Sequence, residues 1–106
     1  MEKNAKVAVI GGGVVGCSIL YHLSKFGLKD CILLERNELT SGSSWHAAGN
    51  VHVISSDPNI SRMMAYTIGL YKEIEKESGH SVCFNASGGF YLASNEVGAD
   101  YLKRER

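Results

Sequence analysis

The chain opens with two short apolar runs that flank an amphipathic segment. Residues 7–10 and 31–35 are continuous runs rich in Val, Ile and Leu, which is typical of parallel strands buried on both faces. Between them, residues 14–25 place apolar side chains at helical spacing, and Gly27 follows where a helix end favours left-handed backbone. The pattern predicts a βαβ unit over residues 7–35 and an α/β fold class.

The pattern changes after this unit. Residues 39–50 are rich in Gly, Ser and Ala, and they predict a loop that lies against a ligand. Asp57 and Pro58 are helix start signals, and apolar side chains then recur every three or four residues until Gly79. This spacing predicts a second, longer helix.

Shorter segments close the chain. Two strand-like runs, residues 82–85 and 90–93, are separated by a Ser-Gly-Gly sequence, which predicts a β-hairpin or a bent strand. Residues 95–106 begin like a helix but carry no stop signal. We therefore expect residues 1–50 to form the βαβ unit and its ligand loop, and residues 51–106 to form a helix and the first strands of a second domain. About 100 residues are few for a closed nucleotide site, so we expect the 106 residues to be the start of a larger two-domain fold.

The composition is that of an ordinary folded domain. The chain holds 11 Lys and Arg against 11 Asp and Glu, and 44% of its residues are hydrophobic, which excludes a disordered chain. A formal net charge of zero shows no excess of basic residues of the kind that binds nucleic acid. No apolar run approaches the about 20 residues of a membrane span. We expect neither nucleic-acid binding nor membrane insertion.

The cysteines and the N-terminus bear on the compartment. Three cysteines lie in apolar settings without C-x-x-C spacing: Cys17, Cys31 and Cys83. They predict reduced thiols and no metal site. Lys3 and Lys6 precede the apolar residues 7–20 as in a signal peptide, but the glycines at 11–13 interrupt that run. We expect a cytoplasmic protein.

A glycine motif joins the first predicted strand to the first predicted helix. The sequence Gly-Gly-Gly-Val-Val-Gly fits G-x-G-x-x-G in the strand-to-helix context that dinucleotide binding requires. Gly11 permits a tight turn, Gly13 removes a side chain where a pyrophosphate approaches the backbone, and Gly16 permits close packing of helix and strand. The amides that open the helix, which include those of Val14 and Val15, face that pyrophosphate. The motif predicts a Rossmann-like dinucleotide-binding unit.

An acid completes this constellation. Glu35 ends the second strand about 20 residues after the glycines, where a carboxylate accepts hydrogen bonds from ribose hydroxyls. Arg36 is a residue type that accepts a 2′-phosphate, but the charge of Glu35 would repel that phosphate, which disfavours NADP. The βαβ unit does not distinguish NAD from FAD as the ligand, because both molecules contain an ADP half.

Three segments carry a family resemblance. They are Val-Ala-Val-Ile-Gly-Gly-Gly-Val-Val-Gly-Cys-Ser at residues 7–18, Leu-Leu-Glu-Arg at 33–36, and Leu-Thr-Ser-Gly-Ser-Ser-Trp-His-Ala-Ala-Gly at 39–49. Together they resemble the start of the D-amino-acid-oxidase-type flavoproteins, and most of all the dimethylglycine and sarcosine dehydrogenase branch. The resemblance runs through most of the chain, and it implies that the dinucleotide is FAD.

The resemblance also implies roles within the small-residue loop. Six residues of this loop are expected to contact the flavin: Ser43, Ser44, Trp45, His46, Ala47 and Gly49. In this branch the histidine carries the flavin through a covalent bond to its 8α-methyl carbon, which implies that role for His46. Two alternatives stay open, a non-covalent flavin beside His46, and a Trp45 that packs against protein instead of covering the cofactor.

The function implied by the resemblance is FAD-dependent oxidation of the N-methyl C–N bond of a small amine or amino acid such as dimethylglycine or sarcosine. No catalytic acid or base and no electron acceptor can be named from these residues. One alternative is an amino-acid oxidase of the same fold that uses oxygen and holds FAD non-covalently. Another is a binding module that senses an adenine dinucleotide without chemistry.

Overall fold

The computed structural model describes residues 4–104. The chain divides into two units, and the boundary in the sequence lies between Asn50 and Val51. Lys3, part of the segment weighed as a signal peptide, lies outside the described residues, as do residues 105–106 at the end of the last expected helix.

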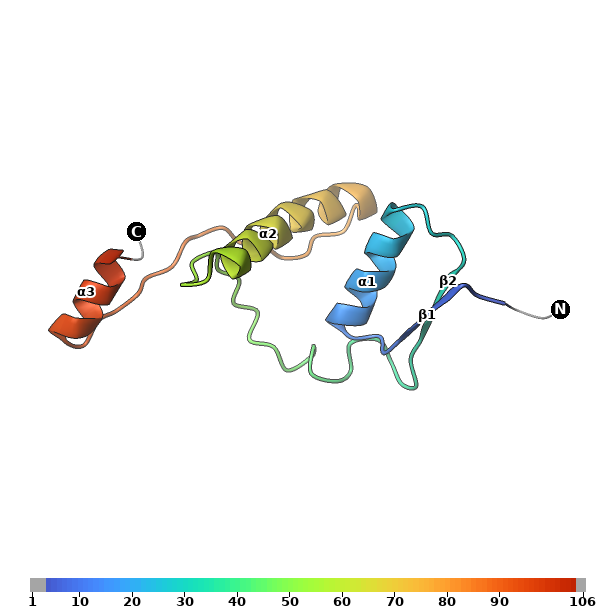
Figure 1. Ribbon diagram of the computed structural model, residues 1–106, viewed down its shortest axis with the longest axis horizontal. Helices are drawn as coiled ribbons and strands as arrows, with labels where there is room; N and C mark the ends of the chain where they lie inside the picture. The colour runs from blue at the N-terminus through green and yellow to red at the C-terminus, as the bar shows by residue number, and fades with distance from the viewer. Residues whose placement is uncertain (1–3, 105–106) are drawn as a thin grey trace. The chain divides into compact units, whose positions relative to one another are not determined.

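The first unit is a parallel β-α-β arrangement (Figure 1). β1 (Val7–Ile10) and β2 (Cys31–Leu34) pair in parallel along their whole length. α1 (Val14–Lys25) connects them and contacts both strands. The predicted elements are confirmed, with β2 ending one residue before Glu35. Gly27 has a φ of +87°, the left-handed geometry expected after the helix.

The sheet is covered on one face. Val9 points toward α1 and is 8% exposed, whereas the next residue, Ile10, is 85% exposed. Successive side chains of a strand point to opposite faces, so the single helix α1 covers only every second residue. The expectation of strands buried on both faces is therefore wrong for the described residues, because Ile10 and Leu34 lie on the face that α1 does not reach.

α2 (Pro58–Ser78) dominates the second unit and matches the predicted helix. The Asp57 carboxylate accepts hydrogen bonds from the amides of Asn59 at 2.7 Å and Ile60 at 3.3 Å, which caps the first turn. Gly79 ends the helix with a φ of +70°, and its amide donates to the Glu75 carbonyl. Both ends are therefore defined by residues adjacent in sequence.

The hairpin expected over residues 82–93 is wrong, because no strand forms there in the described chain. The Val82 amide donates to the Glu75 carboxylate at 2.8 Å instead of to a neighbouring strand. Cys83 adopts a φ of +57° and Gly88 a φ of +78°, so the backbone leaves the extended region within or beside each run. A strand needs a partner for its backbone groups, and neither run pairs with a partner in the described chain.

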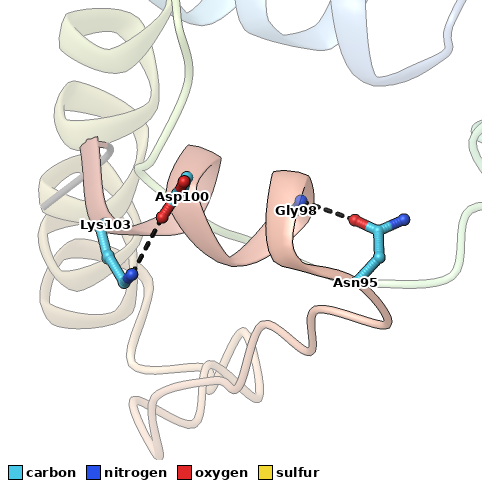
Figure 2. Close-up of polar contacts among 4 residues, drawn as sticks. All are labelled: Asn95, Gly98, Asp100 and Lys103. Carbon is cyan, nitrogen blue, oxygen red and sulfur yellow. Dashed lines mark hydrogen bonds and ion pairs between the residues drawn. The ribbon is translucent and has the colours of Figure 1, made fainter.

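α3 (Glu96–Arg104) is the last described helix. Figure 2 shows its two ends: the Asn95 side-chain oxygen accepts from the Gly98 amide at 2.7 Å, and Lys103 contacts Asp100 at 2.9 Å. The predicted helix is confirmed as far as Arg104. Among residues 4–104, no helix combines the length and the apolar composition needed to cross a membrane.

Candidate functional site

The site begins at the turn between β1 and α1. Gly11 adopts a φ of +103°, which favours glycine, and its amide donates to the Leu34 carbonyl at 2.8 Å. Gly16 is buried, and a Cβ added there would overlap the Gly11 carbonyl oxygen. The tight turn and the close approach of helix to strand predicted for these glycines are therefore both present.

Glu35 reaches across to this turn. One carboxylate oxygen accepts from the Gly12 amide at 2.6 Å, and the other accepts from the Asn37 amide at 2.9 Å. These amide donors, that of Gly12 foremost, hold the pKa of the Glu35 carboxyl below its ordinary value of 4.5, while partial burial opposes the shift. Glu35 is therefore an ionised acceptor next to the glycine turn at neutral pH.

The N-terminus of α1 contacts the small-residue loop. Gly13 is the cap residue of α1 and supplies no side-chain cap. The Val14 amide donates instead to the hydroxyl oxygen of Ser44 at 2.8 Å, thirty residues along the chain. A Cβ added at Gly13 would lie 3.2 Å from that same hydroxyl oxygen. An acceptor oxygen thus already sits at the amide end of the helix.

The loop itself folds into consecutive turns over residues 39–46. Thr40 has a φ of +64°, its amide donates to the Gly12 carbonyl at 2.9 Å, and its carbonyl accepts from the Trp45 amide at 3.1 Å. The His46 ring nitrogen Nδ1 lies 3.0 Å from the Gly42 carbonyl oxygen. Because a carbonyl oxygen only accepts, Nδ1 donates and Nε2 carries the free lone pair of the neutral ring.

A cleft of about 400 Å³ opens between the glycine turn and this loop. It is lined by Gly13, Glu35, Arg36, Asn37, Thr40, Ser41 and Gly42. The structure thus brings three of the predicted site residues, Gly13, Glu35 and Arg36, into one cleft. Four residues of the lining were not named as site residues: Asn37, Thr40, Ser41 and Gly42. The last three belong to the loop over residues 39–50 that the sequence predicts to lie against a ligand, whereas Asn37 follows Glu35 and Arg36 directly and had no signal of its own.

The other predicted residues are not part of the cleft lining. Gly11 and Gly16 belong to the turn and the first turn of α1, and Val14 and Val15, which begin α1, are exposed. The loop residues lie at the surface, and Trp45 is 77% exposed. The members of this surface set are Ser43, Trp45, His46, Ala47 and Gly49, whereas Ser44 is half-buried.

The arrangement has the chemistry of a dinucleotide site. Backbone amides at a helix N-terminus bind phosphate oxygens, and a carboxylate at the end of the second strand binds ribose hydroxyls. Glycines at the closest approach leave the backbone accessible to such a ligand.

Comparison with known proteins identifies the ligand class. A model of the FAD dependent oxidoreductase family, DAO, matches residues 6–106. The chain belongs to the DAO family of FAD-dependent oxidoreductases. The family implies FAD as the cofactor, which agrees with the donors and acceptors of the cleft.

Individual curated proteins are similar to this chain over nearly its whole length. Human mitochondrial dimethylglycine dehydrogenase is 43% identical over 102 residues, which are 96% of this chain and 12% of the relative. Human mitochondrial sarcosine dehydrogenase is 39% identical over 98% of this chain and 11% of its own length. The formaldehyde-forming 4-methylaminobutanoate oxidase of Paenarthrobacter nicotinovorans is 38% identical over 96% of this chain. The chain thus spans about an eighth of the length of the curated relatives it matches.

Proposed function

We propose that the first unit binds the ADP half of FAD in the cleft beside Glu35 and receives the flavin near the loop that carries His46. The observation that carries this proposal is the joint placement of an ionised Glu35 carboxylate and of Gly13, from the glycine turn, at one cleft. Glu35 uses one acceptor position of each oxygen on backbone amides. A carboxylate has about four such positions, so capacity for two ribose hydroxyls is left.

The proposed contacts follow the two halves of the cofactor. The ADP half is assigned to the turn and the strand end: Gly11, Gly13, Val14, Val15, Gly16, Glu35 and Arg36. The flavin side is assigned to the loop: Ser43, Ser44, Trp45, His46, Ala47 and Gly49. Ser44 connects the two sets, because its hydroxyl contacts the Val14 amide at the start of α1, where a pyrophosphate oxygen would bind.

His46 is proposed as the covalent attachment site of the flavin. Its Nδ1 is engaged by the Gly42 carbonyl, which leaves the Nε2 lone pair as the nucleophile toward the 8α-methyl carbon. Formation of this N–C bond releases two protons and two electrons in total. Bound FAD would supply the two-electron acceptor for this bond formation, and the electron acceptor of the enzyme would take up both electrons. The exposure of His46 and the exposed Trp45 beside it give a large planar group access to this nitrogen.

The proposed reaction is the oxidative demethylation of an N-methyl amino acid of the dimethylglycine or sarcosine type. FAD supplies a two-electron acceptor for the hydride that leaves the N-methyl carbon. The resulting iminium ion adds water, and its C–N bond breaks to give formaldehyde, a proton and the demethylated amine. Two of the similar proteins are named for such substrates and a third for forming formaldehyde, which supports this class of reaction.

The covalent link is tested on the whole protein by acid precipitation and peptide mass spectrometry. We expect the yellow colour to stay with the pellet and the peptide that contains His46 to carry the mass of FAD. His46→Ala should release the flavin to the supernatant, whereas the control His52→Ala should retain it in the pellet. An unmodified His46 peptide from yellow, active protein would contradict the covalent bond and leave FAD binding intact.

An oxygen-using oxidase of the same fold is a second candidate, because one of the similar proteins is named an oxidase. Dimethylglycine turnover that produces hydrogen peroxide without an added electron acceptor would favour this candidate. A non-catalytic dinucleotide sensor is the third candidate. It predicts FAD binding with no reduction of the flavin by any N-methyl amine under anaerobic conditions.

A further inference from the structure

The middle glycine of the turn, Gly12, has contacts that the glycine motif does not require. Its amide donates to Glu35 at 2.6 Å, and its carbonyl accepts from the Thr40 amide at 2.9 Å. The residue is buried, and a Cβ added there would lie 2.5 Å from the Leu39 side chain and 3.1 Å from the Cβ of Glu35. Gly12 therefore connects the Glu35 carboxylate, which is proposed to bind the ADP half, to the start of the small-residue loop, residues 39–50. Because the flavin is proposed to bind there, this loop is called the flavin loop below.

Thr40 continues this connection into the loop. Its carbonyl accepts from the Trp45 amide at 3.1 Å, and Trp45 is the neighbour of His46. Thr40 holds a φ of +64°, which a β-branched residue adopts rarely, so the contacts at its two peptide groups must hold it there. The path from Glu35 through Gly12 and Thr40 to Trp45 consists of three hydrogen bonds to backbone amides.

We infer that Thr40 is a positioning residue that docks the flavin loop onto the glycine turn, so that both halves of FAD are bound in one fixed register. This inference rests on the proposed function, because it assigns the two ends of the path to the two halves of FAD. Thr40 acts through its backbone, and its side chain is not required. Loss of its amide should weaken binding of the whole cofactor more than binding of ADP, although Thr40 also lines the cleft proposed for the ADP half.

Two substitutions at this position separate the backbone from the side chain. Thr40→Pro removes the amide donor and forces φ to about −65°, which is incompatible with the observed +64°. Thr40→Gly keeps the amide, favours positive φ and removes the side chain. In the whole protein, calorimetric titration with ADP and with FAD measures the two affinities for each variant. The flavin is removed from the protein before each titration. If the flavin is covalently bound, the Thr40 substitutions are made in the His46→Ala variant, from which the flavin can be removed.

We expect Thr40→Pro to lower FAD affinity about tenfold, the upper range for one lost hydrogen bond, and to lower ADP affinity by clearly less, because ADP makes no contact with the part of the loop that carries His46. Thr40→Gly keeps the amide and should lower FAD affinity less than Thr40→Pro does. Equal losses of ADP and FAD affinity in the proline variant would indicate a merely structural role and overturn the inference. So would unchanged FAD affinity. A parent protein that binds no FAD would contradict the proposed function itself.

Hydrogen–deuterium exchange on the parent protein keeps the inference testable if the proline variant does not fold. Amides of residues 39–46, those of Thr40 and Trp45 in particular, should exchange slowly before any cofactor is added, because both donate to backbone carbonyls. Fast exchange at both amides would show that the loop is not docked on the turn and would overturn the inference.

Discussion

Glu35 shows how one side chain can organise a site before any ligand binds. Each of its oxygens accepts a backbone amide, one from the glycine turn and one from the turn that follows β2. These contacts hold the turn in place and keep the carboxylate ionised. Replacement of Glu35 therefore changes both the local backbone and the acceptor proposed for the ribose.

The lowered pKa of Glu35 predicts a pH effect on stability. A carboxyl group whose folded pKa lies below its ordinary value of 4.5 stabilises the fold fully above that value. The stabilisation is lost as the pH falls through the folded pKa. Thermal unfolding followed from neutral pH to below 4.5 should show this loss in the parent and a smaller loss in Glu35→Gln. Glu38→Gln is the control variant, because Glu38 is an exposed glutamate three residues after Glu35. Identical pH profiles for parent and Glu35→Gln would contradict the prediction.

The helices differ in what defines their ends. α2 is capped at Asp57 and ended at Gly79 by residues adjacent to it in sequence. α1 has no side-chain cap of its own, and the Val14 amide at its start is satisfied by Ser44 from the distant loop. The start of α1 therefore depends on tertiary contacts, and these are contacts that a ligand can modulate.

The local cap of α2 predicts a measurable loss on its removal. Asp57→Ala removes the acceptor of two amides and should destabilise the helix by about 1 kcal/mol, whereas Asp57→Asn should cost only a few tenths. Denaturant unfolding monitored by circular dichroism measures the difference between the two variants. Equal stability of Asp57→Ala and Asp57→Asn would show that the cap contributes nothing.

At the scale of the whole chain, the described residues supply one part of the proposed cofactor site. The cleft offers the contacts proposed for the ADP half. Trp45 and His46 of the flavin loop are exposed, and Ile10 is uncovered on the second face of the sheet. A flavin enzyme also needs walls around the ring system and a pocket that closes over the substrate. The described residues provide the proposed binding groups for the cofactor, and the loop that carries His46 is exposed.

This predicts that residues 1–106 expressed by themselves have no amine dehydrogenase activity and bind FAD weakly. The ordering cost of the loop remains, while contacts that would cover the apolar face are not made. Dye reduction with dimethylglycine and with sarcosine, in excess FAD, measures the activity, and the whole protein is the positive control. Steady turnover by the purified 106 residues would contradict the prediction.

The sequence by itself determined the features that local physics controls. The order β1, α1, β2 followed from apolar periodicity, and the left-handed glycines Gly27 and Gly79 marked helix ends because few other residues adopt positive φ. Asp57 marked the start of α2 through its own side chain. The placement of Glu35 at the end of the second strand followed from the same pattern.

Only the tertiary structure decided what lies next to what. Gly12 and Glu35 are 23 residues apart and Val14 and Ser44 are 30 apart, so no local pattern predicts these hydrogen bonds. The hairpin failed for the same reason, because a strand exists only where a partner accepts its backbone groups, and Glu75 took the Val82 amide instead. Propensity is a property of a segment, whereas hydrogen-bond partners and burial depend on which segments the chain brings together.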